Sequence, residues 1–107
     1  EVRHRINYLA IKDYYAKSTN KAIDFEDFKS KYDLKNEEIL TMGDDLPDMN
    51  IMKISGISAC PKNAVPEVKE ISEYISPIEG GKGAVRDVIE QVMKIQGKWI
   101  DDHTQSI

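Results

Sequence analysis

The sequence predicts an α/β fold in which helices flank a parallel β-sheet, and three observations lead to this prediction. Short apolar runs that suit buried strands, notably residues 39–42 and 57–60, each stop at a glycine or a proline. Segments with the three-to-four-residue apolar spacing of helices alternate with these runs. The 107 residues are 40% hydrophobic and 32% charged, a composition typical of one packed globular domain and too apolar for intrinsic disorder.

The N-terminal third is expected to contain two helices and a short strand. Three apolar residues at spacings of four and three predict a helix over residues 1–10, and residues 11–15 suit a short strand. A second helix is expected over residues 21–32, after a polar loop that can cap it. The apolar stripe of this helix consists of Ala22, Phe25, Phe28 and Tyr32.

The central third is expected to run from loop to strand to helix to strand. Residues 34–38 form a polar loop before the apolar run 39–42, which is predicted to be a buried parallel strand. Residues 48–55 are expected to form a brief helix that a glycine terminates, and residues 57–60 are expected to form the next strand.

The C-terminal third is expected to add a helix over residues 66–71, a third strand over residues 74–76 and a long final helix. Pro66 suits a first helical turn, and a glycine-rich turn precedes the final helix, which begins at Ala84 and stops near Gly97. The apolar stripe of the final helix consists of Val85, Val88, Ile89, Val92 and Ile95.

This order of elements favours a Rossmann-like arrangement with right-handed crossovers. Ligands of such sheets bind at the carboxyl ends of the strands. The residues that follow Met42, Cys60 and Ser76 are therefore the first candidates for a functional site.

Charge and composition argue against several classes of partner. The net charge is −4, without the clustered Lys and Arg that nucleic acids and anionic membranes require. Cys60 is the only cysteine, so no internal disulfide can form. No apolar run approaches the length of a membrane span, which is about 18 residues. We expect a cytoplasmic protein that binds neither nucleic acid nor membrane.

The loop after the strand predicted over residues 39–42 carries three carboxylates, those of Asp44, Asp45 and Asp48. A divalent cation would relieve their mutual repulsion, and Mg²⁺ takes oxygen ligands of this kind. Asp44, nearest the strand, is the predicted metal ligand, and Asp48 is a second ligand or orients a metal-bound water. The alternative is that these residues form turns and a helix cap, and spacing alone leaves the two readings equally open.

Residues Leu40-Thr41-Met42-Gly43-Asp44-Asp45-Leu46-Pro47-Asp48 resemble the fourth motif of the haloacid dehalogenase phosphatases. The flanking residues resemble one branch of that family, the phosphatases of 3-deoxy-D-manno-octulosonate 8-phosphate. The similarity covers nearly the whole chain. Further matching segments are Tyr8-Leu9-Ala10-Ile11, Asn20-Lys21, Asn63-Ala64-Val65-Pro66-Glu67, Gly80-Gly81-Lys82-Gly83-Ala84-Val85-Arg86 and Gln96-Gly97-Lys98, with the tail Gln105-Ser106-Ile107.

The resemblance implies roles for individual residues. In the family an Asp nucleophile forms an aspartyl phosphate beside a magnesium ion, and Asp44 matches the metal-binding Asp of the fourth motif. Lys21 matches the third motif and is expected to bind the phosphate and to act in catalysis together with Asp48. Arg86 matches a residue near the active site and is expected to bind the substrate, although an ion pair with Glu90 explains it equally well. Gly80 and Gly81 are expected to line the substrate site.

Two family motifs are missing, the nucleophile motif and the second motif, which is a Thr or Ser after another strand. The nucleophile motif Asp-x-Asp appears nowhere in the chain. We therefore expect residues 1–107 to be the C-terminal portion of a single phosphatase domain, with the nucleophile upstream and a flexible tail over residues 98–107. By the same resemblance the tail reaches a neighbouring active site in a homotetramer, and the fragment alone is expected to be inactive.

The resemblance predicts a Mg²⁺-dependent phosphatase that converts 3-deoxy-D-manno-octulosonate 8-phosphate to the free sugar acid and phosphate, a step in making lipopolysaccharide precursors. The alternatives are a phosphatase of nine-carbon acylneuraminate 9-phosphates and a non-catalytic domain of an acylneuraminate cytidylyltransferase. A phosphoacceptor receiver module ranks lowest, because its acidic pair precedes its Lys, the reverse of Lys21 and Asp44.

Overall fold

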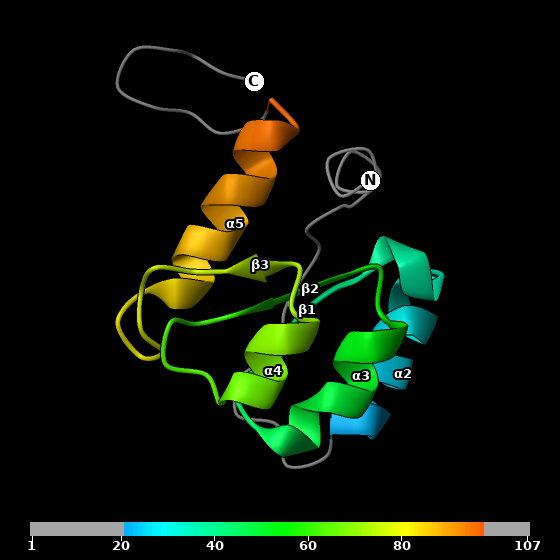
Figure 1. Cartoon of the computed structure of the whole chain (residues 1–107). Helices are drawn as coiled ribbons and strands as arrows, with labels where there is room; N and C mark the ends of the chain where they lie inside the picture. The colour runs from blue at the N-terminus through cyan, green and yellow to red at the C-terminus, as the bar shows by residue number, and fades with distance from the viewer. Residues whose placement is uncertain (1–20, 98–107) are drawn as a thin grey trace.

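The computed structural model of the chain describes residues 21–97 (Figure 1). The helix predicted over residues 1–10, the strand predicted over residues 11–15 and the tail over residues 98–107 lie outside this part. Among the helices of residues 21–97, none combines the length and the apolar composition that crossing a membrane requires.

Strands and helices alternate along the described chain, as the sequence predicted. The two short 3₁₀ helices are labelled η1 and η2. In order the elements are α2 (Lys21–Tyr32), η1 (Asn36–Glu38), β1 (Leu40–Met42), η2 (Leu46–Asp48), α3 (Met49–Ile54), β2 (Ile57–Cys60), α4 (Pro66–Ile71), β3 (Tyr74–Ile75) and α5 (Ala84–Ile95).

The three strands form one parallel sheet in the order β1-β2-β3. Leu40 pairs with Ile57, and Ala59 pairs with Tyr74. The predicted parallel α/β architecture is therefore confirmed. A helix crosses over between each pair of consecutive strands, α3 between β1 and β2 and α4 between β2 and β3, which is what parallel pairing requires.

The central strand β2 is buried along its whole length, and its side chains alternate between two faces. On one face Ile57 packs against Val92 of α5. On the other face Cys60 packs with Met52 of α3 and Val68 of α4. The result is three layers, with α5 on one side of the sheet and α3 and α4 on the other, as Figure 1 shows.

Helix α5 turns a slightly different face to the core than the sequence predicted. Its buried side chains are Ala84, Val88 and Val92, whereas Val85 is 42% exposed. The assignment of Val85 to the apolar stripe was wrong. The positions four apart, 84, 88 and 92, face the sheet, and Val85 is turned about 100° away from Ala84 at 3.6 residues per turn.

Helix α2 contributes mainly one buried side chain, Phe25. Phe28 and Tyr32 are half-buried, and their rings meet edge to face with centroids 5.2 Å apart. Ala22 is exposed, so its assignment to the apolar stripe was wrong. After the helix, Asp33 adopts a left-handed conformation with φ 54°, and this reverses the chain.

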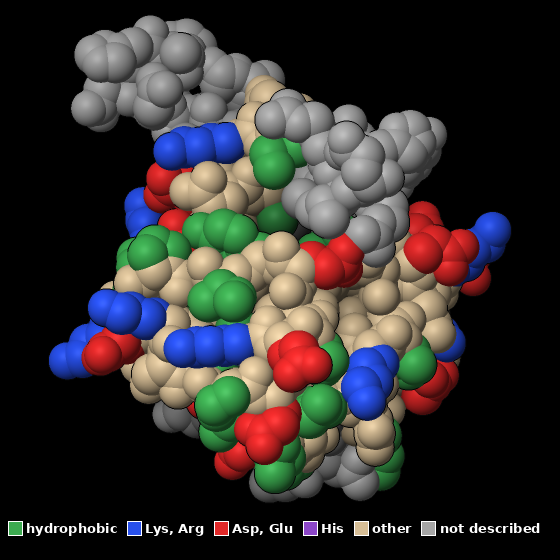
Figure 2. Space-filling view, in the orientation of Figure 1, with side chains coloured by type: hydrophobic (Ala, Val, Ile, Leu, Met, Phe, Trp, Pro, Cys, Tyr) green, Lys and Arg blue, Asp and Glu red, His purple; other side chains and the backbone are tan. Residues whose placement is uncertain are grey.

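Differences in element bounds are small, with one addition. The loop predicted over residues 34–38 contains the 3₁₀ helix η1, where the Lys35 backbone N–H donates to Glu38 Oε1 at 2.9 Å. The helix predicted over residues 48–55 is α3, and a 3₁₀ helix that was not predicted, η2, precedes it over residues 46–48. On the face drawn in Figure 2, cationic and anionic side chains are interspersed rather than gathered by sign.

Candidate active site

Three loops leave the carboxyl ends of the parallel strands and lie next to one another. They are residues 43–48 after β1, residues 61–65 after β2 and residues 77–83 after β3. The Val65 backbone N–H donates to the Asp44 carbonyl oxygen at 3.0 Å, which joins the first loop to the second. The Lys62 backbone N–H donates to the Ile78 carbonyl oxygen at 3.0 Å, which joins the second loop to the third. The predicted site residues of these loops therefore share one edge of the sheet.

The acidic loop is organised around Asp48, which is only 7% exposed. Its Oδ2 atom accepts the backbone N–H of Asp44 at 2.9 Å and that of Asp45 at 3.2 Å. Two amide donors on one carboxylate oxygen satisfy a buried charge that would otherwise be costly. Asp48 thus folds back over the start of its own loop.

Gly43 makes room for that carboxylate. A Cβ atom at position 43 would lie 2.8 Å from Asp48 Oδ2 and closer still to Asp48 Cβ, which is inside van der Waals contact. The Gly43 backbone N–H donates to the Ala59 carbonyl oxygen at 3.1 Å, so the backbone cannot easily move aside. The glycine directly after β1 is therefore required for the loop to close.

Asp45 accepts hydrogen bonds from backbone N–H groups of the same loop. Its Oδ1 atom accepts the Leu46 N–H at 2.7 Å, and its carbonyl oxygen accepts the Asp48 N–H at 3.0 Å. These are the bonds of a residue that caps the short helix η2. The turn-and-cap reading therefore describes Asp45, and it describes part of what Asp48 does.

Asp44 differs from its two neighbours. Its backbone is held on both sides, by Asp48 at the N–H and by Val65 at the carbonyl, while the residue itself is exposed. Within residues 21–97 its carboxylate has neither a hydrogen-bond partner nor an ion-pair partner. A rigid backbone with an uncommitted carboxylate at the strand end is what a metal-binding position needs.

The carboxylate oxygens of this loop can supply part of the coordination of a Mg²⁺ ion. No three His, Cys, Asp or Glu side chains converge on one point within the described residues. Mg²⁺ usually keeps several waters and uses one or two carboxylates with substrate phosphate, so one oxygen donor from this loop suits it. Asp44 has that donor available, whereas Oδ2 of Asp48 already accepts two amides.

The remaining predicted residues lie on α2, in the third loop and on α5. Lys21 is the first residue of α2, and its side chain lies outside the described part. The Gly80 backbone N–H already donates to Asn63 Oδ1 at 2.8 Å, and Gly81 has φ 80°. Arg86 is exposed in the first turn of α5.

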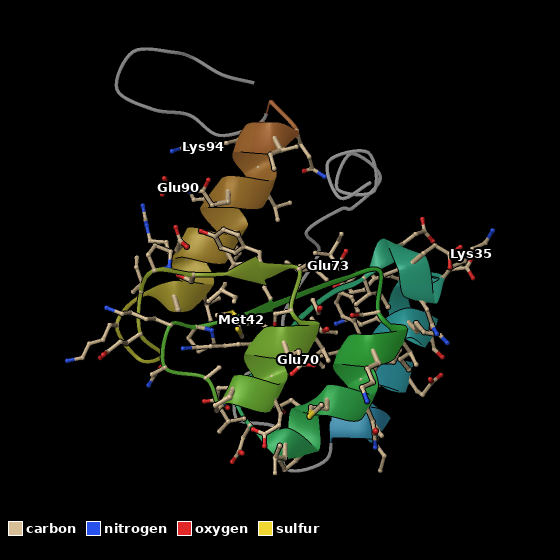
Figure 3. All side chains as sticks on the ribbon, in the orientation of Figure 1. Lys35, Met42, Glu70, Glu73, Glu90 and Lys94 are labelled. Carbon is tan, nitrogen blue, oxygen red and sulfur yellow. The ribbon has the colours of Figure 1, made fainter. Side chains whose placement is uncertain are left out.

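Glu90, the alternative partner of Arg86, forms an ion pair with Lys94, with 2.9 Å between Oε2 and Nζ. Figure 3 shows the two side chains along α5. Lys94 is exposed and Glu90 is half-buried, so solvent screens the pair and it adds little to stability.

Two polar residues near the site were not predicted. Asn63 ties the second loop to the third through Gly80. Asp87 accepts hydrogen bonds at Oδ2 from the hydroxyls of Tyr74 at 2.8 Å and Ser76 at 2.7 Å. Desolvation, the bond to Asp87 and its negative charge raise the pKa of Tyr74 to about 12, so this hydroxyl stays a donor. The chain separations, 17 residues for Asn63 and 11 to 13 for Asp87, leave no local sequence pattern.

Comparison with known proteins gives a consistent result. A family model described as haloacid dehalogenase-like hydrolase matches residues 7–89. The 3-deoxy-D-manno-octulosonate 8-phosphate phosphatase KdsC of Escherichia coli K12 is 35% identical over 106 residues, which cover 99% of this chain and 56% of the relative. The corresponding protein of Yersinia pestis is 30% identical over 94 residues, which cover 88% of this chain and 50% of the relative. The chain thus spans about half the length of these relatives.

Solved structures agree with the sequence relatives. A 3-deoxy-D-manno-octulosonate 8-phosphate phosphatase from Yersinia pestis superposes with a TM-score of 0.69 at 28% identity, over 74% of this chain and 43% of that chain. The enzyme of that name from Moraxella catarrhalis, in complex with magnesium ion, phosphate ion and a KDO molecule, gives a TM-score of 0.68 at 29% identity, over 74% and 45%.

Proposed function

This chain belongs to the haloacid dehalogenase-like hydrolase family, and on that premise we propose that the complete protein hydrolyses 3-deoxy-D-manno-octulosonate 8-phosphate to the free sugar acid and phosphate. The observation that carries the proposal is the loop after β1. It presents the Asp44 carboxylate at the carboxyl edge of a parallel sheet, in a chain that resembles phosphatases of this substrate along 99% of its length.

We propose Mg²⁺ as the cofactor, with Asp44 as a ligand and Asp48 as the residue that supports the loop. When bound, the metal would neutralise charge on the phosphoryl oxygens. The contribution of this chain is to hold the Asp44 backbone at both ends, so that its carboxylate needs little reorganisation on binding. Asp48 supports this by keeping the amides of Asp44 and Asp45 turned inward.

Lys21 and Arg86 are proposed to bind the substrate. Lys21 opens the 12-residue helix α2, and an ammonium at the N-terminal end of a helix suits a phosphate group. Arg86 lies in the first turn of α5, and a guanidinium suits a two-pronged contact with a carboxylate or phosphate. Gly80 and Gly81 are proposed to line the same site, with the Gly80 amide engaged by Asn63.

The chain lacks an Asp-x-Asp motif, so we propose that the nucleophile belongs to residues outside it. In this reading residues 1–107 are the C-terminal portion of one phosphatase domain, with residues 98–107 as its tail, and the fragment alone is inactive. A homotetramer in which the tail approaches a neighbouring active site, and a cytoplasmic location, stay predictions.

The test is phosphate release by the full-length protein with Mg²⁺ present. We expect turnover of 3-deoxy-D-manno-octulosonate 8-phosphate that EDTA abolishes and Mg²⁺ restores. If the protein prefers an acylneuraminate 9-phosphate, the proposed substrate is wrong but the proposed reaction, hydrolysis of a phosphate ester, stands. Absence of hydrolysis of either ester would contradict the proposal and favour a non-catalytic domain.

A further inference from the structure

The first turn of α5 is fastened to the sheet by one carboxylate. Asp87 follows Arg86 directly, and its Oδ2 atom accepts the hydroxyl hydrogens of both Tyr74 and Ser76. Ser76 is completely buried, so its hydroxyl has little alternative to this partner. Removal of the acceptor would leave a buried donor unsatisfied.

Ser76 extends this connection in two further directions. Its backbone N–H donates to the Cys60 carbonyl oxygen at 2.8 Å, which ties it to the end of β2. Its Oγ atom accepts the Ile78 backbone N–H at 3.0 Å, which turns the third loop. A continuous series of hydrogen bonds therefore runs from the central strand through Ser76 to α5.

The hydrogen bonds from the second loop reach only the first half of the third loop. Lys62 and Asn63 bond to Ile78 and Gly80 from the second loop. Beyond that point Gly81 and Gly83 both have positive φ, 80° and 107°, and a Cβ atom at either position would have no neighbour within 4 Å. Gly83 also has no side chain with which to cap α5. The position of the α5 start therefore depends on the buried Ala84 and on the hydrogen bonds of Asp87 more than on the loop that leads to it.

We propose that Asp87 is a positioning residue that sets where Arg86 lies, acting through Tyr74 and Ser76. This inference rests on the proposed function and takes the sugar-acid carboxylate, of the two groups named there, as the group that Arg86 binds. Because the Oδ2 atom of Asp87 is bonded to Tyr74 and Ser76, Asp87 acts through Arg86, and its effect should be confined to substrates that use Arg86. Its role is to accept hydrogen bonds, so a neutral side chain with an oxygen in the same place can replace it.

The kinetic test uses the full-length protein and two substrates, 3-deoxy-D-manno-octulosonate 8-phosphate and p-nitrophenyl phosphate, which has no carboxylate. For Asp87→Ala we expect KM for the sugar-acid ester to rise about tenfold, the size expected for the loss of one hydrogen bond to a charged group, with kcat within about twofold. Hydrolysis of p-nitrophenyl phosphate should not change. Asp87→Asn should restore the wild-type KM, and Lys94→Ala, on the same helix, should leave both substrates unaffected.

An equal loss on both substrates, or no change on either, would overturn the inference. A second measurement does not depend on the substrate. Hydrogen exchange of the full-length protein should show faster exchange at the Ile78 and Asp87 amides in Asp87→Ala than in Asp87→Asn, with α3 and α4 unchanged. Unchanged exchange at these amides would contradict the inference about Asp87. Failure of the wild-type protein to hydrolyse the sugar-acid ester would instead contradict the proposed function.

Discussion

The Asp48 carboxylate accepts the backbone N–H of Asp44 at 2.9 Å, so the buried acid of the loop positions the exposed one. The two residues therefore have different roles, as the sequence analysis allowed when it named Asp44 the metal ligand and Asp48 a second ligand or a residue that orients a metal-bound water. Asp44 keeps its carboxylate uncommitted within the described residues, and Asp48 keeps the loop closed. The division leads to separate expectations for the two side chains.

Asp44→Asn in the full-length protein should lower kcat by about 10²–10³-fold, because the metal would lose a charged ligand. The free energy of unfolding should change by less than about 0.5 kcal/mol, since the side chain is exposed. Phosphate release at increasing Mg²⁺ concentration, with chemical denaturation, checks both. Asp45→Asn is the matched control, because its amide oxygen can still accept the Leu46 N–H. Unchanged turnover and Mg²⁺ affinity in Asp44→Asn would remove Asp44 from the metal site.

Asp48→Ala should destabilise the full-length protein by about 1–3 kcal/mol, because two backbone N–H groups lose their acceptor in a buried place. Asp48→Asn should lose less stability than Asp48→Ala, since its amide oxygen can replace Oδ2 as the acceptor. Urea denaturation measures both variants. If Asp48 were instead a direct ligand, Asp48→Asn would weaken Mg²⁺ binding as strongly as Asp44→Asn.

The raised pKa of Tyr74 predicts a stability change at high pH. The folded state holds the phenol proton up to about pH 12, whereas an unfolded tyrosine titrates near 10. The unfolded state therefore gains by ionising first, and this contribution to stability, complete below pH 10, is lost as the pH rises towards 12. Between these values the unfolding free energy should fall more steeply for the wild type than for Tyr74→Phe. The absorbance of phenolate is measured against pH for both proteins. Subtracting the Tyr74→Phe curve from the wild-type curve leaves the titration of Tyr74, one of the five tyrosines of this chain. A difference spectrum that titrates near pH 10 would contradict the expectation.

Two valines on α5 should respond differently to truncation. Val92→Ala removes a side chain that is 4% exposed and packs against Ile57, and it should cost about 1–3 kcal/mol. Val85→Ala removes a side chain that is 42% exposed, and it should change stability by less than about 0.5 kcal/mol. Thermal and urea unfolding of the full-length variants provide the comparison. Equal costs would mean that Val85 is covered in the complete protein.

For residues 21–97 the sequence by itself determined the order of helices and strands, the parallel sheet and the loop that carries the candidate metal ligand. These features depend on apolar periodicity and on turn residues, which act over a few positions. The run 57–60 had to be buried on both faces, and it became the central strand β2. The family motif then distinguished Asp44, where spacing left metal site and turn equally open.

Only the tertiary structure decided which face of α5 packs against the sheet and which carboxylates accept hydrogen bonds from the backbone. Val85 and Ala84 are neighbours in the chain, yet helix rotation buries one and exposes the other. The bonds from Tyr74 and Ser76 to Asp87, and from Gly80 to Asn63, join residues 11 to 17 positions apart. Such bonds exist only after strand register and helix packing have brought separate loops together, so no local pattern of residues encodes them.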